Sequence, residues 1–133
     1  MDRHARILVV DDDEKIRNSM KTILEDEGYI VDLAATGKEA IKRTEETAYN
    51  LALLDIRLPD IDGVDLLKLM KDAVPRTRKI MVTGEHHYRN ARAALNKNAD
   101  AYLIKPIEIG KLLSTVKEQL ELRETEKDLA SKG

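Results

Sequence analysis

Short apolar runs alternate with amphipathic helical patterns five times along this chain of 133 residues. The five runs, which predict strands, lie at residues 5–10, 30–34, 51–54, 79–83 and 101–104. Strands that alternate with helices form right-handed crossovers, which make the strands parallel and place helices on both faces of one sheet. The pattern therefore predicts an α/β fold, a doubly wound five-stranded parallel sheet.

The helical patterns between the strands have recognisable ends. Gly28 follows the first helix as a typical C-terminal stop, and Thr36 with Glu39 has the capping-box spacing that opens the second. Pro75 ends the third, because proline lacks the backbone N–H that a helix interior needs. The fourth pattern has small residues around Leu95, which predicts a short and weakly packed helix.

The fifth helix starts near Ile109, and its apolar stripe fades after Leu120 into a strongly charged segment. A chain of this length is expected to form one domain. We therefore place one domain over residues 1–122 and interpret residues 123–133 as a charged helix end or the start of a linker.

Composition excludes several classes of function. The 25 Asp and Glu nearly balance the 23 Lys and Arg, and because nucleic-acid binding without sequence preference needs a basic surface, we expect none by this domain. The chain has no Cys, which excludes disulfides and thiolate metal sites and suits a reducing compartment. Its first apolar run is too short for a signal peptide or a membrane span, so we expect a cytoplasmic protein that does not enter the membrane.

Acidic residues and one lysine follow three of the predicted strands. Asp11 and Asp12 follow the first run, Asp55 the third and Lys105 the fifth. The carboxyl ends of parallel strands share one edge of the sheet, where open α/β sheets bind ligands. Two carboxylates ~4 Å apart repel by about 4 kcal/mol at a surface-like dielectric, and Mg²⁺, which prefers oxygen ligands, offsets that repulsion. A lone Asp there is often only solvated or a helix cap, but three such acids with a lysine indicate a site for a divalent cation and a phosphoryl group.

Phosphoryl transfer to a carboxylate depends mainly on positioning and on charge stabilisation. Asp55 is the candidate nucleophile, Lys105 the candidate point charge on one phosphoryl oxygen, and Thr83 a candidate hydroxyl donor to another. Taken alone, Thr83 reflects only the β-propensity of threonine; the other residues give it the functional interpretation.

Two other motifs are weaker. Residues 60–63 suggest a calcium loop, but that pattern would put Leu58 and Leu69 at its first and last ligand positions. His86 and His87 are adjacent rather than four apart, so we expect a solvated loop instead of a shared metal site. The chain has no glycine-rich phosphate loop, and we expect no bound nucleotide.

Four motifs together resemble the receiver domain of two-component response regulators over about residues 5–120. They are ILVVDDD at 7–13, LLDIRLPDIDG at 53–63, MVTGE at 81–85 and DAYLIKP at 100–106. The resemblance implies a (βα)₅ flavodoxin-like fold with strand order 2-1-3-4-5. It also implies a phosphorylation-activated signalling switch in a phosphorelay, not a turnover enzyme.

The resemblance assigns the acidic residues to phosphoryl transfer and metal binding. Asp55 would accept a phosphoryl group from a sensor histidine kinase or a phosphotransfer protein. Asp11, Asp12, Asp55 and the backbone carbonyl of Arg57 would hold Mg²⁺, with Mn²⁺ as an alternative.

Other residues would respond to the phosphoryl group. Thr83 and Tyr102 would form a switch pair, and Lys105–Pro106 would be a cis peptide. The switch would remodel the face made by the fourth helix, fifth strand and fifth helix, which a partner helix or a second receiver, as in a homodimer, would recognise.

Residues at the pocket mouth differ from one family member to another. Arg57 and Glu85 occupy the two variable positions there, and we expect them to lie close enough to pair and to modulate access of water. Gly84 stands where the family usually has Ala or Ser, which predicts a looser loop.

Two alternative functions remain open. A Mg²⁺-dependent phosphohydrolase of the haloacid-dehalogenase type also has Asp-x-Asp after an apolar strand, as at Asp11 and Asp13, although Lys15 stands where Thr or Val is expected. Steady turnover of a phosphoester would favour that enzyme, whereas one retained phosphate per chain would favour the switch. A third class, a receiver-like binding module that takes no phosphate, conflicts with the intact Asp55, Thr83 and Lys105.

Overall fold

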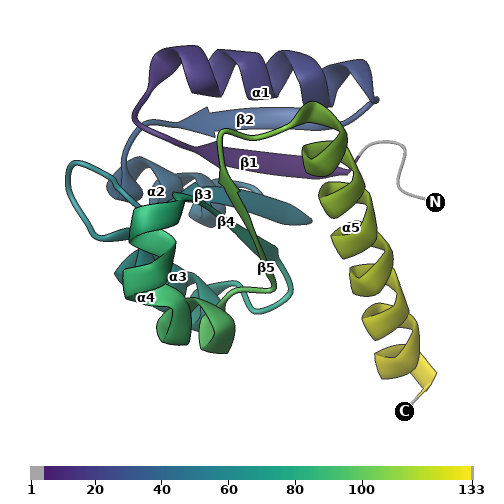
Figure 1. Cartoon of the computed structure of the whole chain (residues 1–133). Helices are drawn as coiled ribbons and strands as arrows, with labels where there is room; N and C mark the ends of the chain where they lie inside the picture. The colour runs from purple at the N-terminus through teal and green to yellow at the C-terminus, as the bar shows by residue number, and fades with distance from the viewer. Residues whose placement is uncertain (1–4, 133) are drawn as a thin grey trace.

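Five parallel strands form one central sheet in the computed structural model, which describes residues 5–132 (Figure 1). The strand order is β2-β1-β3-β4-β5, which confirms the predicted doubly wound, flavodoxin-like arrangement. Strands and helices alternate along the chain as β1 (Arg6–Val10), α1 (Glu14–Asp26), β2 (Ile30–Ala34), α2 (Gly37–Glu46), β3 (Leu51–Asp55), α3 (Gly63–Ala73), β4 (Arg78–Gly84), α4 (Glu85–Asn98), β5 (Ala101–Lys105) and α5 (Ile109–Lys132).

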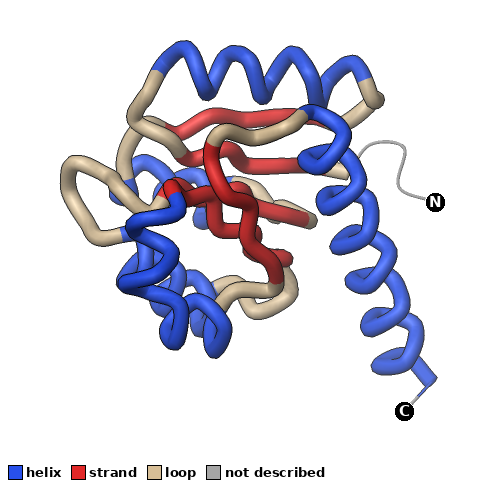
Figure 2. Tube along the Cα trace, viewed as in Figure 1, coloured by secondary structure: helices blue, strands red, loops and turns tan. Residues whose placement is uncertain are grey.

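Helices cover both faces of the sheet (Figure 2). Ile7 and Val9 of β1 pack with residues of α1 and α5 on one face, and Leu8 and Val10 pack with residues of α2, α3 and α4 on the other. Because neighbouring side chains of a strand point to opposite faces, a central strand buried on both must be apolar throughout. This is why continuous apolar runs, rather than alternating ones, marked the strands in the sequence.

Local signals in the sequence set several helix ends. Thr36 is the N-cap of α2, and its side chain accepts a hydrogen bond from the backbone N–H of Glu39 at 3.0 Å. Gly28 has a φ of 94°, a left-handed conformation that glycine adopts without steric cost. Asp13 and Asp62 are the N-caps of α1 and α3, so two acids of the motif regions have a structural role.

The fourth helix differs from the sequence prediction. α4 has 14 residues and starts at Glu85, so His86 and His87 lie in its first turn and not in a solvated loop. An acidic residue in the first turn interacts favourably with the helix dipole, which explains why the helix begins directly after Gly84. Within α4 only Leu95 is buried, which agrees with the predicted light packing.

The fifth helix continues to Lys132 and runs past the sheet (Figure 1). Contacts with the start of β4 hold its charged half. Arg78 Nη1 lies 2.7 Å from Glu126 Oε1, and Arg123 Nε donates to the backbone carbonyl of Arg76 at 3.0 Å. The charged segment is therefore helical as far as Lys132; residues 1–4 and 133, which the expected domain boundaries include, lie outside the described residues. Within residues 5–132, no helix is both long and apolar enough to cross a membrane.

Candidate phosphoryl and metal site

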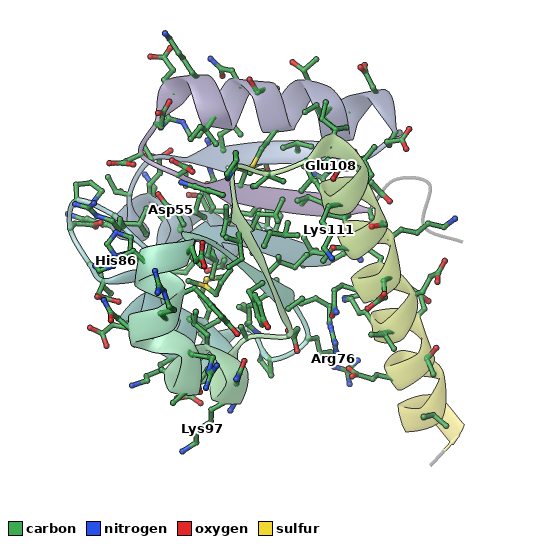
Figure 3. The ribbon with its side chains drawn as sticks, viewed as in Figure 1. Asp55, Arg76, His86, Lys97, Glu108 and Lys111 are labelled. Carbon is green, nitrogen blue, oxygen red and sulfur yellow. The ribbon has the colours of Figure 1, made fainter. Side chains whose placement is uncertain are left out.

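Three carboxylates converge at the carboxyl edge of the sheet, as the sequence predicted. One oxygen each from Asp11, Asp12 and Asp55 lies within 4.8 Å of the others. Asp11 is 2% exposed and Asp55 is 5% exposed, whereas Asp12 is open to solvent. Figure 3 shows Asp55 at the opposite end of the sheet from Arg76, which lies beside the C-terminal half of α5.

A tight turn after β1 fixes the first two acids. The backbone N–H of Asp13 donates to Asp11 Oδ1 at 2.9 Å, and the Asp13 side chain accepts from the backbone N–H groups of Lys15 and Ile16. Arg17 Nη1 donates to the backbone carbonyl of Asp11 at 2.7 Å. These hydrogen bonds fix the end of β1 and use Asp11 Oδ1, so Asp11 Oδ2 remains available for Lys105.

Lys105 faces both buried carboxylates. Its Nζ lies 3.4 Å from Asp11 Oδ2 and 3.4 Å from Asp55 Oδ1, and its side chain is 30% exposed. The following Lys105–Pro106 peptide bond is cis, the geometry that the family resemblance implies. One lysine at the end of β5 therefore balances part of the charge contributed by the ends of β1 and β3.

The electrostatics of the site favour a bound cation. Burial raises the pKa of the Asp55 carboxyl, and the charge of Asp11 raises it further, while Lys105 and the backbone N–H of Arg57 act in the opposite direction. Three carboxylates and one ammonium leave excess negative charge in a partly buried space. Carboxylate oxygens are the ligands that Mg²⁺ prefers, so this set of residues fits the metal that the sequence predicts.

Thr83 and Tyr102 lie on the neighbouring strands β4 and β5, Thr83 near the carboxyl end of its strand and Tyr102 three residues before Lys105. Thr83 is fully buried, and its hydroxyl donates to the backbone carbonyl of Gly84 at 3.2 Å. Tyr102 is 40% exposed, and its ring stacks on Tyr88 of α4 with centroids 4.5 Å apart. The Tyr102 side chain therefore links β5 to α4 on the surface of the molecule.

The expected pairing of Arg57 with Glu85 is wrong for this structure. Among residues 5–132, no ion pair joins the two; instead, Arg57 Nη1 lies 3.5 Å from Nε2 of His87. The difference follows from the early start of α4, which puts His87 in the first turn of the helix, within reach of Arg57 in the β3–α3 loop. No pattern in the sequence singles out His87, because a histidine expected in a loop has no predictable direction.

The roles of two residues were missed from the sequence, Asp60 in the β3–α3 loop and Gly63 at the start of α3. A Cβ at Gly63 would lie 2.6 Å from the backbone oxygen of Asp55 and 2.5 Å from Cα of Ile56, so only glycine lets the chain return this close to the strand. The carboxylate of Asp60 accepts hydrogen bonds from the backbone N–H groups of Gly37 and Lys38 at 2.8 and 2.9 Å. Asp60 and its partners are more than twenty residues apart in sequence, and no local pattern marks such a contact.

Comparison with known proteins shows the family to which the chain is similar. The model of the response regulator receiver domain family matches residues 7–117. The transcriptional regulatory protein DltR of Streptococcus agalactiae is 35% identical over 112 residues, which are 84% of this chain and 50% of DltR. The chain thus spans about half the length of that curated relative.

Two solved structures are similar along most of both chains. A CheY-like response regulator receiver domain protein from Methanospirillum hungatei is 46% identical with a TM-score of 0.87, over 92% of this chain and 98% of that one. The response regulator TrrA of Thermotoga maritima, solved with Mg²⁺ and BeF, is 35% identical with a TM-score of 0.79, over 86% of this chain and 98% of that one. Nothing in these comparisons supports the haloacid-dehalogenase alternative. The chain belongs to the response regulator receiver domain family, the signalling domains of two-component systems.

Proposed function

We propose that Asp55 accepts a phosphoryl group from a phosphohistidine of a sensor kinase or a phosphotransfer protein. The observation that carries the proposal is the environment of Asp55: a buried carboxylate at a strand end, within 4.8 Å of two further acids and 3.4 Å from Lys105 Nζ. Receiver domains are signalling domains and not metabolic enzymes, so the phosphoryl group is a signal and not a product.

Asp55 and the residues around it have different roles in the proposed transfer. An Asp55 oxygen forms the new bond to phosphorus while the phosphorus–nitrogen bond to the donor histidine breaks, and the donor imidazole keeps the electron pair. Lys105 neutralises charge on the transferred group and on Asp55, and Asp11, Asp12, Asp55 and the Arg57 carbonyl would hold Mg²⁺. The bound cation supplies positive charge to phosphoryl oxygens. Water later hydrolyses the acyl phosphate and restores the carboxylate.

A groove beside Lys105 suits the donor protein. It runs between α1 and the start of α5, and Ile16, Met20, Pro106 and Ile109 are among the mainly apolar residues that line it. An amphipathic helix can place apolar anchors in such a groove, and a histidine on that helix would reach the edge of the sheet that holds Asp55. A helix of the kinase or phosphotransfer protein is therefore the expected occupant.

Phosphorylation is proposed to change the α4-β5-α5 face. Thr83 would turn its hydroxyl from Gly84 to the phosphoryl group, and Tyr102 would leave its exposed stack on Tyr88 for the vacated space. The change is a shift between two packings, and it cannot exceed the difference in phosphoryl binding between them. A partner helix, or a second receiver forming a homodimer, would bind the altered face.

Intact mass after incubation with acetyl phosphate tests the proposal. Wild type should gain about 80 Da, one phosphoryl group, only when Mg²⁺ is present. Asp55→Asn, which nearly preserves the shape of the side chain, should remain unlabelled and folded. Equal labelling of Asp55→Asn, or full labelling of wild type in EDTA, would show that the site is wrongly assigned.

A further inference from the structure

The loop between β3 and α3 is held to the rest of the domain at two places. At its base, Arg57 and Asp62 form an antiparallel bridge, and the backbone N–H of Gly63 donates to the carbonyl of Ile56 at 2.8 Å. At its apex, Asp60 is bound to the first turn of α2. Arg57 lies in this loop, and its backbone carbonyl is the one expected metal ligand that is not a side chain.

At the apex of the loop, the carboxylate of Asp60 accepts hydrogen bonds from backbone N–H groups at the start of α2. The first N–H groups of a helix have no acceptor within the helix, and Asp60 accepts from two of them, those of Gly37 and Lys38. Both hydrogen bonds lower the pKa of the Asp60 carboxyl, so the ionised form is the bound form. The side chain of Ile61 occupies the space that a Cβ of Gly37 would fill, and this adds an apolar contact beside the two hydrogen bonds.

We propose that Asp60 is a positioning residue for the cation site: by anchoring the loop to α2, it holds the Arg57 carbonyl in place beside the three carboxylates. This inference rests on the proposed function, because it assigns Asp60 a role in metal binding. The side chain of Arg57 cannot fix the loop as firmly, since it is exposed and its contact is the 3.5 Å approach to His87. Substitution of a residue that holds a metal ligand in place commonly lowers metal affinity about ten- to hundredfold.

A matched control is available at the same helix end. Thr36 caps α2 through the N–H of Glu39 but belongs to the β2–α2 connection, and within residues 5–132 no side-chain hydrogen bond joins it to the β3–α3 loop. Thr36→Ala and Asp60→Ala both remove caps from α2, and only Asp60→Ala releases the loop. A comparison of the two separates anchoring of the loop from stabilisation of the helix.

The decisive experiment is calorimetric titration of Mg²⁺ into wild type, Asp60→Ala, Asp60→Asn and Thr36→Ala without a phosphodonor. Asp60→Ala should raise the Mg²⁺ dissociation constant about tenfold, and Asp60→Asn, which keeps one acceptor oxygen, should give a smaller increase. Thr36→Ala should bind as wild type does. At saturating Mg²⁺, the rate at which acetyl phosphate labels Asp55 should return to the wild-type value in Asp60→Ala.

Amide hydrogen exchange across residues 56–63 gives a readout that needs no metal. Asp60→Ala should exchange faster there than wild type and Thr36→Ala. Unchanged exchange and Mg²⁺ affinity in Asp60→Ala, or an equal loss of affinity in Thr36→Ala, would overturn the inference. If wild type itself neither bound Mg²⁺ nor became labelled, the proposed function would fail together with the metal role, and the exchange data would still show whether Asp60 anchors the loop.

Discussion

Asp55, the proposed phosphoacceptor, must be ionised and yet lies buried, and these two requirements conflict. A nucleophile must be ionised, and an ionised carboxylate loses solvation when it is buried. The structure reconciles them in part through Lys105, 3.4 Å away, but the neighbouring Asp11 opposes that effect. The proposed phosphoacceptor therefore lowers the stability of the fold, as is common for residues of active sites.

The first prediction concerns the stability of Asp55→Asn in metal-free buffer. The raised pKa of Asp55 means that the folded protein binds this proton more tightly than the unfolded chain, so stability falls as pH rises from the usual Asp range, about pH 4, through the raised value. Asn carries no charge and avoids this loss. At pH 7 we expect the variant to be more stable by about 1 kcal/mol, or about 4 °C in Tm.

Thermal melts as a function of pH check this prediction. The difference between variant and wild type should shrink toward about pH 4, and Mg²⁺ should raise the Tm of wild type more than that of Asp55→Asn. A wild type that is the more stable protein at pH 7 in EDTA would show that burial does not disfavour the Asp55 charge.

The second prediction concerns the lifetime of the phosphoryl group. Arg57 is exposed and follows Asp55 by two residues. Water must approach in line with the new bond to phosphorus, and we propose that the bulk of Arg57 shields the acyl phosphate. A barrier lower by about 0.5–1 kcal/mol speeds hydrolysis about two- to fivefold, and we expect a change of this size in Arg57→Asn with little change in Tm.

Two further variants extend the test. His87→Ala should also speed decay of the acyl phosphate, because His87 is the side chain that Arg57 approaches. Glu85→Ala is the control and should leave the decay rate unchanged. The decay of labelled protein, followed by intact mass, measures all three. A rate that stayed the same or slowed in Arg57→Asn would rule out shielding.

Whole elements were easier to predict from the sequence than contacts between them. The five strands followed from apolar runs that must be buried on both faces, and Thr36 and Gly28 marked helix ends by local chemistry. The start of α4 was misplaced because its apolar pattern begins only at Ala91, six residues after the helix starts. The Asp60 and His87 contacts could not be predicted, since each joins segments that are remote in sequence and that only the folded chain brings together.

The third prediction concerns the C-terminal half of α5. Arg78 connects the start of β4 to this helix through the side chains of Gln119 and Glu126. Arg78→Met would leave the buried Gln119 oxygen without this donor, at a cost of about 1–3 kcal/mol. We expect lower stability and faster amide exchange over residues 119–126.

Glu126→Ala is the matched control for this contact. It removes only the exposed partner, for which about 0–1 kcal/mol is typical, and should cause the smaller change in both stability and exchange. Equal effects of Glu126→Ala and Arg78→Met would show that the exposed ion pair, and not the contact with Gln119, holds the helix.

At the scale of the whole molecule, the acidic site and the face proposed to respond to phosphorylation are built by different parts of the fold. The three carboxylates and Lys105 come from the ends of three strands, so the sheet itself fixes their convergence, and strand-end acids and a lysine were enough to predict it. The exposed Tyr102 of β5 instead stacks on the lightly packed α4. Elements with few buried contacts are those that rearrange at low cost, so within the α4-β5-α5 face we expect the change mainly at α4 and Tyr102.

The central claim, a switch driven by phosphorylation of Asp55, is tested most directly by amide hydrogen exchange with and without beryllofluoride and Mg²⁺, which together mimic the phosphorylated state. In wild type, the amide exchange rates should change at the carboxyl edge of the sheet and over α4, β5 and the start of α5. In Asp55→Asn, these rates should stay the same. The same response in Asp55→Asn, or a wild type whose α4-β5-α5 face exchanges identically in both conditions, would contradict the account.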